Sequence, residues 1–493
     1  MPGRIVVRKF HALSAFFIAI NCLPLQAQDT LEPIKLGSVT FSGSIRDRLE
    51  NWHWFTPATG EPAYTFNGTT ARFSLSQSRE SFDWLVEMEA PILIGLPQNS
   101  VAPGTQGQLG QGATYYVSNH KESNVAMLFP KQVSLRIHNA FGSKFSTLKL
   151  GRFEFQDGGE VIAKDPTMLV IKRDRVQQRL IGPFTFTDVM RGFDGFHYVY
   201  NKPAINYTFI GAVPTRGVSQ VDGWGWIDVA FGYLSATKQI QTASTTAEWR
   251  AFGIYYDDWR NVVKADNRPA AIKAADHTNI RIFTYGGHYV QVTKTPVGTI
   301  DLMGEGALQV GNWGVLTQRA GMFDVEAGYQ PKILPRLKPW LRAGYYYGSG
   351  DKDPNDGKHG TFFQILPTAR PYARFPFYDM ENNVDRFAML TLKPYKRITF
   401  HNEVHSLRLA SHNDLWYTGG GAFQPWTFGY QSRSGSGATS LANLYDVNVD
   451  VNVNARLTVT PYLGYAAGKS VIQAIYPKGK DGHLAFLEVT YKF

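Results

Sequence analysis

The chain has 493 residues, with 50 Lys and Arg against 40 Asp and Glu, a single Cys, and 14% aromatic residues. One Cys excludes a disulfide scaffold, and the absence of any apolar run of about 18 residues after the N-terminal region excludes a helical membrane protein. Only 18% of the residues are charged, so the chain can bury enough apolar surface to offset its ordering entropy, which argues against disorder.

The first 27 residues have the composition of a secretory signal peptide. A basic stretch at 4–9 precedes an apolar stretch at 12–20, and Ala27 places a small side chain just before the expected cleavage point. We therefore expect residues 1–27 to be removed and residues 28–493 to form the exported protein. The only thiol lies in the removed part, which suits an oxidising envelope compartment.

Apolar and polar residues then alternate along the chain with a period of two, and almost no segment shows helical spacing. The clearest alternating segments, in chain order, lie within 39–46, 72–75, 82–89, 133–138, 300–310, 341–347, 447–453, 457–465 and 485–493. In 447–453 every second residue is Val, and a tight turn is expected at 454–456 before the next strand. Such a period predicts an all-β protein whose strands each have one apolar face.

A soluble β-sandwich would also alternate, but three features favour a transmembrane barrel. The polar face carries charges deep within the strands, as expected beside a water-filled lumen. Aromatic residues gather toward segment ends, for example Trp52, Trp54 and Tyr491, where a membrane-interface girdle needs them. The chain stops on Phe493 at the end of its best strand, as expected for recognition by the barrel-assembly machinery. We therefore predict a single antiparallel β-barrel in the bacterial outer membrane.

The connections between the predicted strands fall into two kinds. Short turns at 331–339 and 393–396 suit the periplasmic side, and Asn67-Gly68-Thr69 is also expected to be a turn. Long polar stretches are expected outside the cell, at 91–130, 156–190, 257–279, 348–384 and 410–443. At roughly 25 residues per strand and connection, the barrel should have about 16–18 strands, which leaves an aqueous channel. No composition break marks a second domain.

A passive channel has no catalytic group, so its chemistry is the electric field inside the pore. Alternate residues of a strand face opposite sides of the wall. If the apolar residues face lipid, the inward-facing residues include Arg46, Arg48, Arg72, Arg136 and Arg342. Guanidinium groups suit carboxylated sugars, because their planar fork pairs bidentately with carboxylate and keeps its charge. Lumen acids would temper the attraction: Asp83, Glu87, Asp194, Glu305 and Glu326. The alternative is that these charges only neutralise one another in a hydrated wall.

One block of the sequence resembles a known family. The run 349–357, followed by Gly-Thr-Phe at 360–362 and Leu-Pro-Thr at 366–368, closely resembles the most recognisable block of the alginate-export family of outer-membrane porins; the Arg-Gly-Phe-Asp-Gly element at 191–195 also fits. The resemblance implies an eighteen-stranded monomeric barrel whose basic pore passes an anionic polysaccharide outward. It adds Arg152 and Arg191 to the pore residues. Ala369-Arg370-Pro371-Tyr372 departs from the family, which often has His here, and leaves the substrate open.

Two possible metal motifs are weak, and no cofactor or metal is expected. His401, Glu403 and His405 share one strand face, but alternate residues lie roughly 6.5–7 Å apart along a strand, too far for all three to close on one ion. Asp351-x-Asp353-x-Asn355 begins like a calcium loop but lacks its glycine and its bidentate acid, so a standard calcium site is rejected. Adventitious calcium on the 351–356 loop stays open.

The sequence argues against two other classes of function. A barrel enzyme is disfavoured because Ser406 and His405, the nearest candidate pair, point to opposite faces of a strand. Nucleic-acid binding is excluded because the basic residues are spread at strand spacing rather than gathered in a patch. A general or anion-selective diffusion porin for small solutes remains the alternative. The expected partners are an anionic polysaccharide, outer-membrane lipid, the assembly machinery and periplasmic export proteins.

Overall fold

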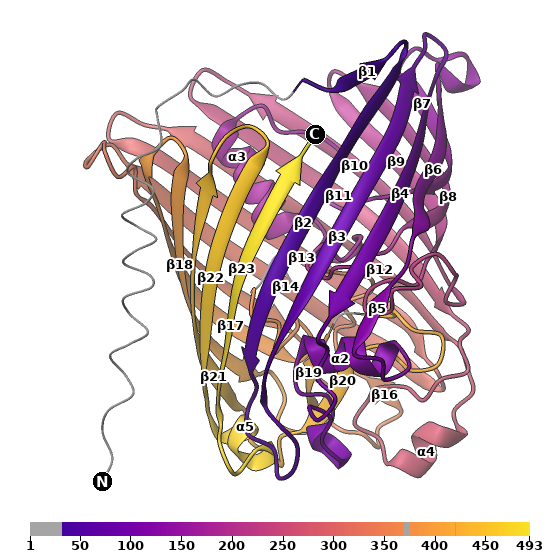
Figure 1. Ribbon diagram of the computed structural model, residues 1–493, viewed down its shortest axis with the longest axis vertical. Coiled ribbons are helices and arrows are strands. Elements are labelled where there is room, and N and C mark those ends of the chain that lie inside the picture. Colours follow the sequence, from indigo (N-terminus) through magenta and orange to yellow (C-terminus); the bar gives the residue numbers. More distant parts are fainter. Residues whose placement is uncertain (1–31, 369–373, 420) are drawn as a thin grey trace.

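The computed structural model describes residues 32–368, 374–419 and 421–493, so the expected signal peptide and the departure at 369–372 lie outside the described residues. Eighteen antiparallel strands form a closed barrel, which confirms the all-β prediction and the eighteen strands implied by the resemblance (Figure 1). The wall closes where β2 (Val39–His53) pairs with β23 (Asp481–Lys492), with Ser44 opposite Lys492.

The remaining elements follow in chain order around the wall. The other wall strands are β3 (Ala63–Ser78), β4 (Phe82–Ile94), β6 (Phe129–His138), β7 (Ser146–Phe153), β8 (Phe193–Lys202), β9 (Ile205–Pro214), β10 (Val229–Gln241), β11 (Thr245–Asp258), β12 (Ile280–Lys294), β13 (Gly298–Trp313), β14 (Leu316–Pro331), β15 (Trp340–Gly348), β17 (Asn383–Tyr395), β18 (Ile398–Leu409), β21 (Ser440–Asn452) and β22 (Leu457–Gly468). Short strands are β1 (Ile34–Leu36), β5 (Asn124–Ala126), β16 (Lys358–His359), β19 (Leu415–Thr418) and β20 (Gln431–Ser434). The helices are η1 (Gly104–Gln106), α2 (Gln111–Ser118), η2 (Ala140–Gly142), α3 (Pro166–Ile171), η3 (Lys172–Val176), α4 (Ala270–Ala275) and α5 (Ser470–Ile475). None of these helices in the described residues is long and apolar enough to cross a membrane.

The alternating residues separate as strand parity predicts. On β13, Leu302 is 44% exposed on the outer surface while the adjacent Asp301 is fully buried on the inner side. Ile300 and Leu308 are likewise exposed, and Glu305 is buried. A row of aliphatic side chains on the outside is what a hydrocarbon environment requires of a barrel wall.

Short and long connections lie at opposite ends of the barrel (Figure 1). The short turn between β21 and β22 is where the sequence predicts it, and the Asn454 side chain accepts hydrogen bonds from the backbone N–H groups of Arg456 and Leu457 at 2.8 and 2.9 Å. The turn predicted at Asn67–Thr69 is wrong. These residues lie in the middle of β3, because they pair with β2 on one side and β4 on the other.

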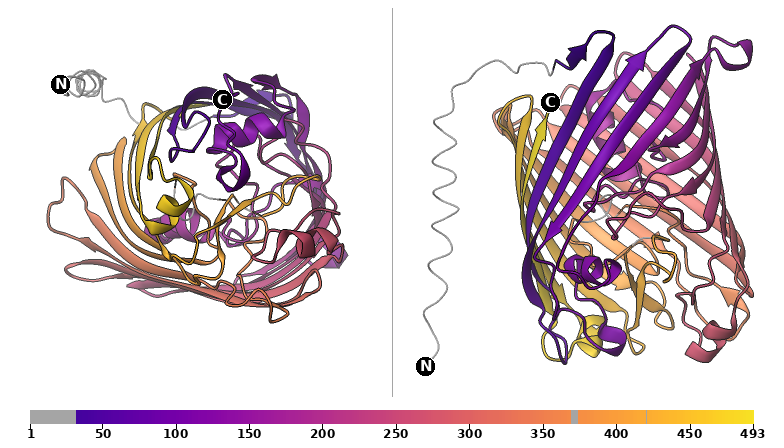
Figure 2. Two further views of the ribbon diagram at one scale, coloured as in Figure 1. Left: turned by 90° about the horizontal axis from the view of Figure 1, so that it is seen from below. Right: turned by 45° about the vertical axis from the view of Figure 1, so that its right-hand side comes forward.

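Several long connections fold into the barrel instead of standing outside it (Figure 2, left). Residues 154–192, between β7 and β8, are called here the inner segment. Its helices α3 and η3 pack against the inner face of the wall, with Met168 and Ile171 buried against Val290 and Met303. The expectation that 156–190 lies outside is therefore wrong. Its apolar side chains are buried against the inward faces of β12 and β13.

The tryptophans at the end of β2 correct a second expectation. Trp52 is 1% exposed and Trp54 is 2% exposed, and both belong to the interior rather than to a lipid-facing girdle. Trp52 packs edge-on against Phe375, and Trp54 stacks on Trp416 with the ring centroids 6.5 Å apart. These rings join the connections 91–130, 348–384 and 410–443 into one apolar core at the end of the barrel with the long connections.

Candidate pore lining

A cavity of about 730 Å³ lies inside the barrel, between the inner segment and the inward faces of β2, β3, β15, β17, β18 and β21 to β23. Its basic lining residues are Arg46, Arg72, Arg173, Arg175, Arg342, Arg374, Lys393 and Lys492, and its acidic ones are Asp174, Glu403, Asp450 and Glu488. The lining thus has eight basic residues against four acidic ones, and acids just behind it, such as Asp188 and Glu326, pair with several of its arginines.

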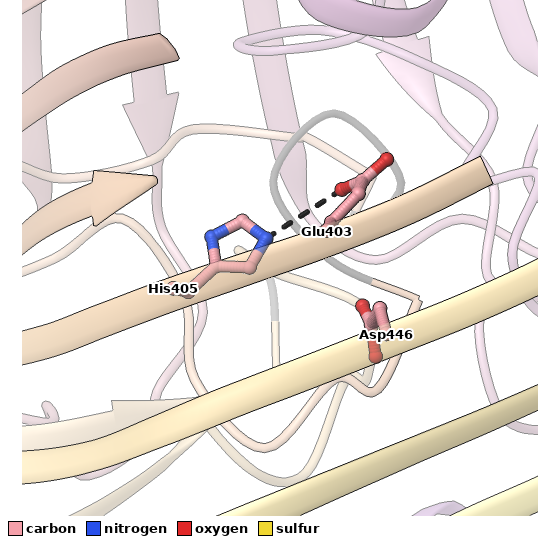
Figure 3. Close-up of side chains that lie close together, drawn as sticks. All are labelled: Glu403, His405 and Asp446. Carbon is pink, nitrogen blue, oxygen red and sulfur yellow. Dashed lines mark ion pairs between the residues drawn. The ribbon is translucent and has the colours of Figure 1, made fainter. Parts of the chain in front are cut away.

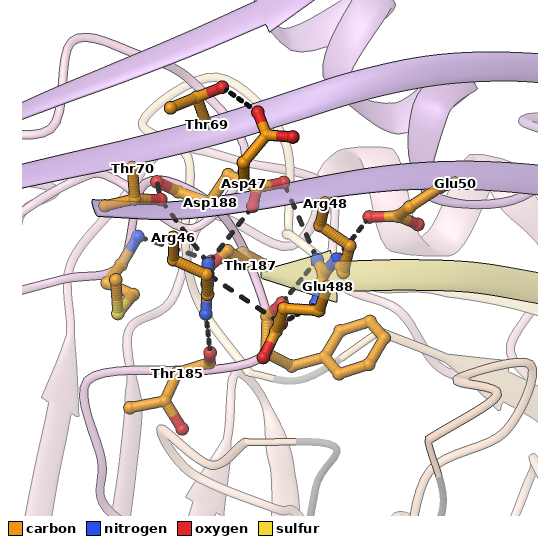
Figure 4. Close-up of polar contacts among 12 residues, drawn as sticks. Arg46, Asp47, Arg48, Glu50, Thr69, Thr70, Thr185, Thr187, Asp188 and Glu488 are labelled. Carbon is orange, nitrogen blue, oxygen red and sulfur yellow. Dashed lines mark hydrogen bonds and ion pairs between the residues drawn. The ribbon is translucent and has the colours of Figure 1, made fainter. Parts of the chain in front are cut away.

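Arg46 and Arg72 reach the cavity from neighbouring strands and are held there by acidic partners. Arg46 donates to the carbonyl of Thr185 at 2.9 Å and to Oδ1 of Asp188 at 3.1 Å, both on the inner segment (Figure 4). Arg72 lies 2.7 Å from Glu89 and 2.8 Å from Glu154. These contacts position both guanidinium groups at the cavity, where each side chain is 16% exposed.

Arg48, two residues along β2, is buried rather than open to the cavity. Its Nε donates to Glu50 at 2.8 Å, and Asp188 lies 3.6 Å from Nη2 (Figure 4). The guanidinium is sandwiched between the rings of Phe186 and Phe486, 4.9 and 5.4 Å from their centroids. Such a site fixes the inner segment to the wall and leaves no face for a solute.

Arg342 and Arg136 also lie in different surroundings. Arg342 on β15 lines the cavity and pairs with Glu326 at 2.6 Å and Asp301 at 3.3 Å. The side chain of Arg136 is 46% exposed and lies 3.8 Å from Asp83, outside the lining of the cavity. Strand parity turns both side chains inward, but only Arg342 lies at the level of the cavity along the barrel.

The residues carried over by resemblance are also outside the cavity lining. Arg152 and Asp194, opposite each other on β7 and β8, form a two-pronged ion pair at 2.7 and 2.6 Å. Arg191 is fully buried in the inner segment, where Nη1 donates to the carbonyl of Ala422 at 3.1 Å. In this arrangement Arg152 joins two neighbouring wall strands, and Arg191 joins the inner segment to the connection at 410–443.

The inner segment adds basic residues that the sequence analysis missed. Lys172, Arg175 and Arg179 face wall acids: Lys172 lies 2.7 Å from Glu248, Arg175 lies 2.8 Å from Glu326, and Arg179 lies 2.7 Å from both Glu305 and Asp324. Four basic residues lie within 172–179, and acidic residues recur at inward positions of β11, β13 and β14. This pairing of a basic connection with acidic strand faces is the sequence signal that could have revealed them. Charge thus holds the segment across the lumen.

A second set of acids lies buried among the long connections. Asp414 accepts hydrogen bonds from the hydroxyls of Thr361 at 2.6 Å and Tyr417 at 2.7 Å. Burial raises the pKa of Asp414 to about 6, and burial likewise raises the pKa of Asp379 and Glu381 well above the usual carboxyl range. Burial therefore lets these carboxyls keep a proton to higher pH than in water, and a protonated carboxyl can also donate a hydrogen bond.

The candidate calcium loop at 351–356 is held by its own backbone. The Asp351 side chain accepts from the N–H of Asp353 at 3.3 Å, and Asp353 accepts from the N–H of Asn355 at 2.9 Å. The side-chain oxygen atoms engaged in this way complete the turns of the loop.

Comparison with known proteins supports the architecture. A family model described as alginate export matches residues 137–471, more than half of the chain. No curated protein sequence matches. The fold is similar to the outer membrane protein OpdK of Pseudomonas aeruginosa, with 9% identity over 92% of this chain and 98% of that chain and a TM-score of 0.54. It is similar to OccK9 (OpdG) of the same organism, with 10% identity over 92% of this chain and 98% of that chain and a TM-score of 0.57. It is also similar to OccAB4 of Acinetobacter baumannii, with 8% identity over 93% of this chain and 98% of that chain and a TM-score of 0.54. At these identities the likeness shows the fold alone.

Proposed function

The chain belongs to the alginate export family of outer-membrane β-barrels, and from this premise we propose that it conducts an anionic polysaccharide, an alginate-like polyuronate or its oligomers, through an arginine-rich lumen. The family and the fold are those of transport channels rather than of enzymes. Outer-membrane lipid, the assembly machinery and periplasmic export proteins are the proposed partners, and a monomer is the proposed state.

The observation that carries the proposal is the excess of basic residues around the cavity. Arg46, Arg72 and Arg342 present guanidinium groups to it from three strands. A uronate polymer carries one carboxylate on each sugar, and guanidinium pairs with carboxylate through two parallel hydrogen bonds. A row of such groups gives a polyanion successive places to bind along its path.

The acidic partners of these arginines keep the attraction moderate. Arg342 already pairs with Glu326, and Arg72 with Glu89. An incoming carboxylate therefore competes with a resident one, so each site binds weakly enough to release its ligand. Conduction needs this balance, because a channel must let its solute leave as well as enter.

The alternative is an anion-selective porin for small solutes. The inner segment narrows the lumen, and the structurally similar channel OpdK has been solved with vanillate. A lumen of this charge would also accept a small carboxylate. The two functions differ in whether a polymer can thread past the inner segment.

Single-channel recording in planar bilayers tests the proposal. We expect anion preference in the reversal potential under a salt gradient, and current block by polyuronate oligomers whose duration grows with their length. Neutral dextran oligomers of matched length are the control and should block far less. Cation preference would contradict the proposal, and block by short acids without length dependence would favour the small-solute porin.

A further inference from the structure

Three potential metal ligands meet on the lumen wall where β18 and β21 run side by side. Glu403 and Asp446 are directly opposite each other in the register of the two strands, and His405 follows two positions along β18 on the same face. One ligand atom from each of the three lies within 4.8 Å of the other two (Figure 3). The distance argument against a site along one strand does not apply, because the third ligand comes from the neighbouring strand.

The ring of His405 is oriented as in a metal ligand. Its Nδ1 lies 2.7 Å from Oδ2 of Asp385 on β17, a contact that fixes the ring and turns Nε2 toward Glu403. Nε2 lies 3.5 Å from Oε2 of Glu403, has no hydrogen-bond partner in the part of the chain that the structure describes, and belongs to a residue that is only 3% exposed. A carboxylate behind a histidine is the usual outer support of a ligating imidazole.

The two acids complete the donor set. Asp446 is held by the hydroxyl of Tyr462, which donates to Oδ1 at 2.5 Å and leaves Oδ2 available. Glu403 lines the 730 Å³ cavity, so an ion could reach the site from the lumen. One imidazole nitrogen with two carboxylates suits Zn²⁺ and related transition ions, whereas Ca²⁺ and Mg²⁺ prefer oxygen ligands alone.

We propose that Glu403, His405 and Asp446 bind one divalent transition-metal ion, such as Zn²⁺, and leave its remaining coordination position to water from the lumen. The bound ion offsets the charge of two carboxylates beside the cavity, so the net charge of this part of the wall becomes less negative. The site stands independently of the polymer that the channel conducts. Its electrical consequence is a lumen that attracts anions more strongly when the metal is bound.

Calorimetric titration of the untagged, EDTA-washed barrel in detergent with Zn²⁺ tests the site. We expect one ion per chain, and binding at least tenfold weaker in His405→Gln and Asp446→Asn. The Asp446→Asn change keeps the shape of the side chain and an oxygen to accept from Tyr462, so it tests the charge without removing that hydrogen bond. Asp385→Asn should weaken binding roughly 10- to 100-fold, because the outer partner of the imidazole loses its charge.

His401→Gln is the matched control. His401 lines the same cavity on the same strand but lies 3.3 Å from Asp450 and outside the trio. Zinc affinity should not change in this variant. The proposal is overturned if the wild-type barrel binds no zinc, if His401→Gln weakens binding as much as His405→Gln, or if zinc binds equally well to both ligand variants. Because zinc binding is measured without polymer, failure here is distinct from failure of polyuronate block.

Discussion

Arg175 on the inner segment donates a hydrogen bond from Nε to Oε1 of Glu326 on β14 over 2.8 Å, although 151 positions separate the two residues in the chain. Both side chains are buried, and the Arg175 guanidinium also lies over the ring of Phe387. With the neighbouring pair of Arg179 and Asp324, this contact holds the inner segment against the wall. These ion pairs therefore help to fix the position of the inner segment inside the barrel.

Replacing Arg175 and Arg179 together by Gln should release the inner segment. Removing one partner from a buried ion pair costs about 3–5 kcal/mol, because an uncompensated charge stays behind. We expect larger and noisier single-channel conductance in planar bilayers. The control is Arg173→Gln, which removes a charge from the cavity lining but pairs at 2.6 Å only with the adjacent Asp174 among the described ion pairs. Equal conductance in the double variant and the wild type would contradict the prediction.

Neutralising Arg46, Arg72 and Arg342 together with Gln should lower anion selectivity, because these three line the cavity. We expect the anion-to-cation permeability ratio to fall roughly tenfold at low ionic strength. The same change at Arg136, which lies outside the cavity lining, should have a much smaller effect. Unchanged heat-modifiable mobility on gels would show that the barrel remains closed. Unchanged selectivity would mean that these arginines do not face the conduction path.

Gly68→Ala should disturb the fit between β3 and the inner segment. A Cβ atom at Gly68 would lie 2.4 Å from Oδ2 of Asp188, the carboxylate that binds Arg46 and Arg48. Forced overpacking typically costs about 1–3 kcal/mol, so the barrel should unfold at a lower temperature in a gel-shift assay. Gly232→Ala on β10, where an added Cβ meets nothing within 4 Å, should leave the transition unchanged. A similar shift in both variants would refute the steric account.

Low pH should stabilise the packed connections. A carboxyl whose pKa is raised in the folded protein keeps its proton where the unfolded chain has lost it, so folding stability falls as the pH rises. The stability that Asp414 contributes begins to fall near its ordinary pKa of about 4 and is lost above about 6. Asp379 and Glu381 extend this fall in stability to higher pH. We expect slower proteolysis of residues 374–419 at pH 5 than at pH 8.

Glu381→Gln is the test of this pH dependence. Oε1 of Glu381 accepts from the N–H of Gln364 at 2.9 Å, and a glutamine oxygen can accept the same hydrogen bond. The glutamine side chain cannot ionise, so proteolysis of the variant should vary less with pH than that of the wild type. If the difference between pH 5 and pH 8 is the same in both proteins, other groups control the stability of these connections.

Strand positions and inward faces could be predicted from the sequence because both follow from local alternation. The period of two in 447–453 identifies β21, and the turn at 454–456 is where Asn454 is expected to supply one. Parity alone also turns Asp301 inward and Leu302 outward. These features need only the next few residues of the chain, and hydrophobic patterning records them directly.

The path of the inner segment could not be predicted in this way. Its position depends on pairs such as Arg175 with Glu326, whose partners lie far apart in the chain, and a polar composition does not distinguish a connection in water from one in a hydrated lumen. The distinction between Arg46 and Arg48 depends on where Phe186 folds back. The placing of Asp446 beside Glu403 likewise depends on the register between two strands.

The seam between β2 and β23 has a consequence for how the molecule forms. Every other neighbouring pair of wall strands is close in sequence, but Ser44 meets Lys492 only after all the strands between them exist. Until then, any partly built sheet has two unsatisfied edges, each a template for pairing with another molecule. Ring closure this distant in sequence is slow, so the nascent polypeptide needs shielding from self-association for the whole of that interval.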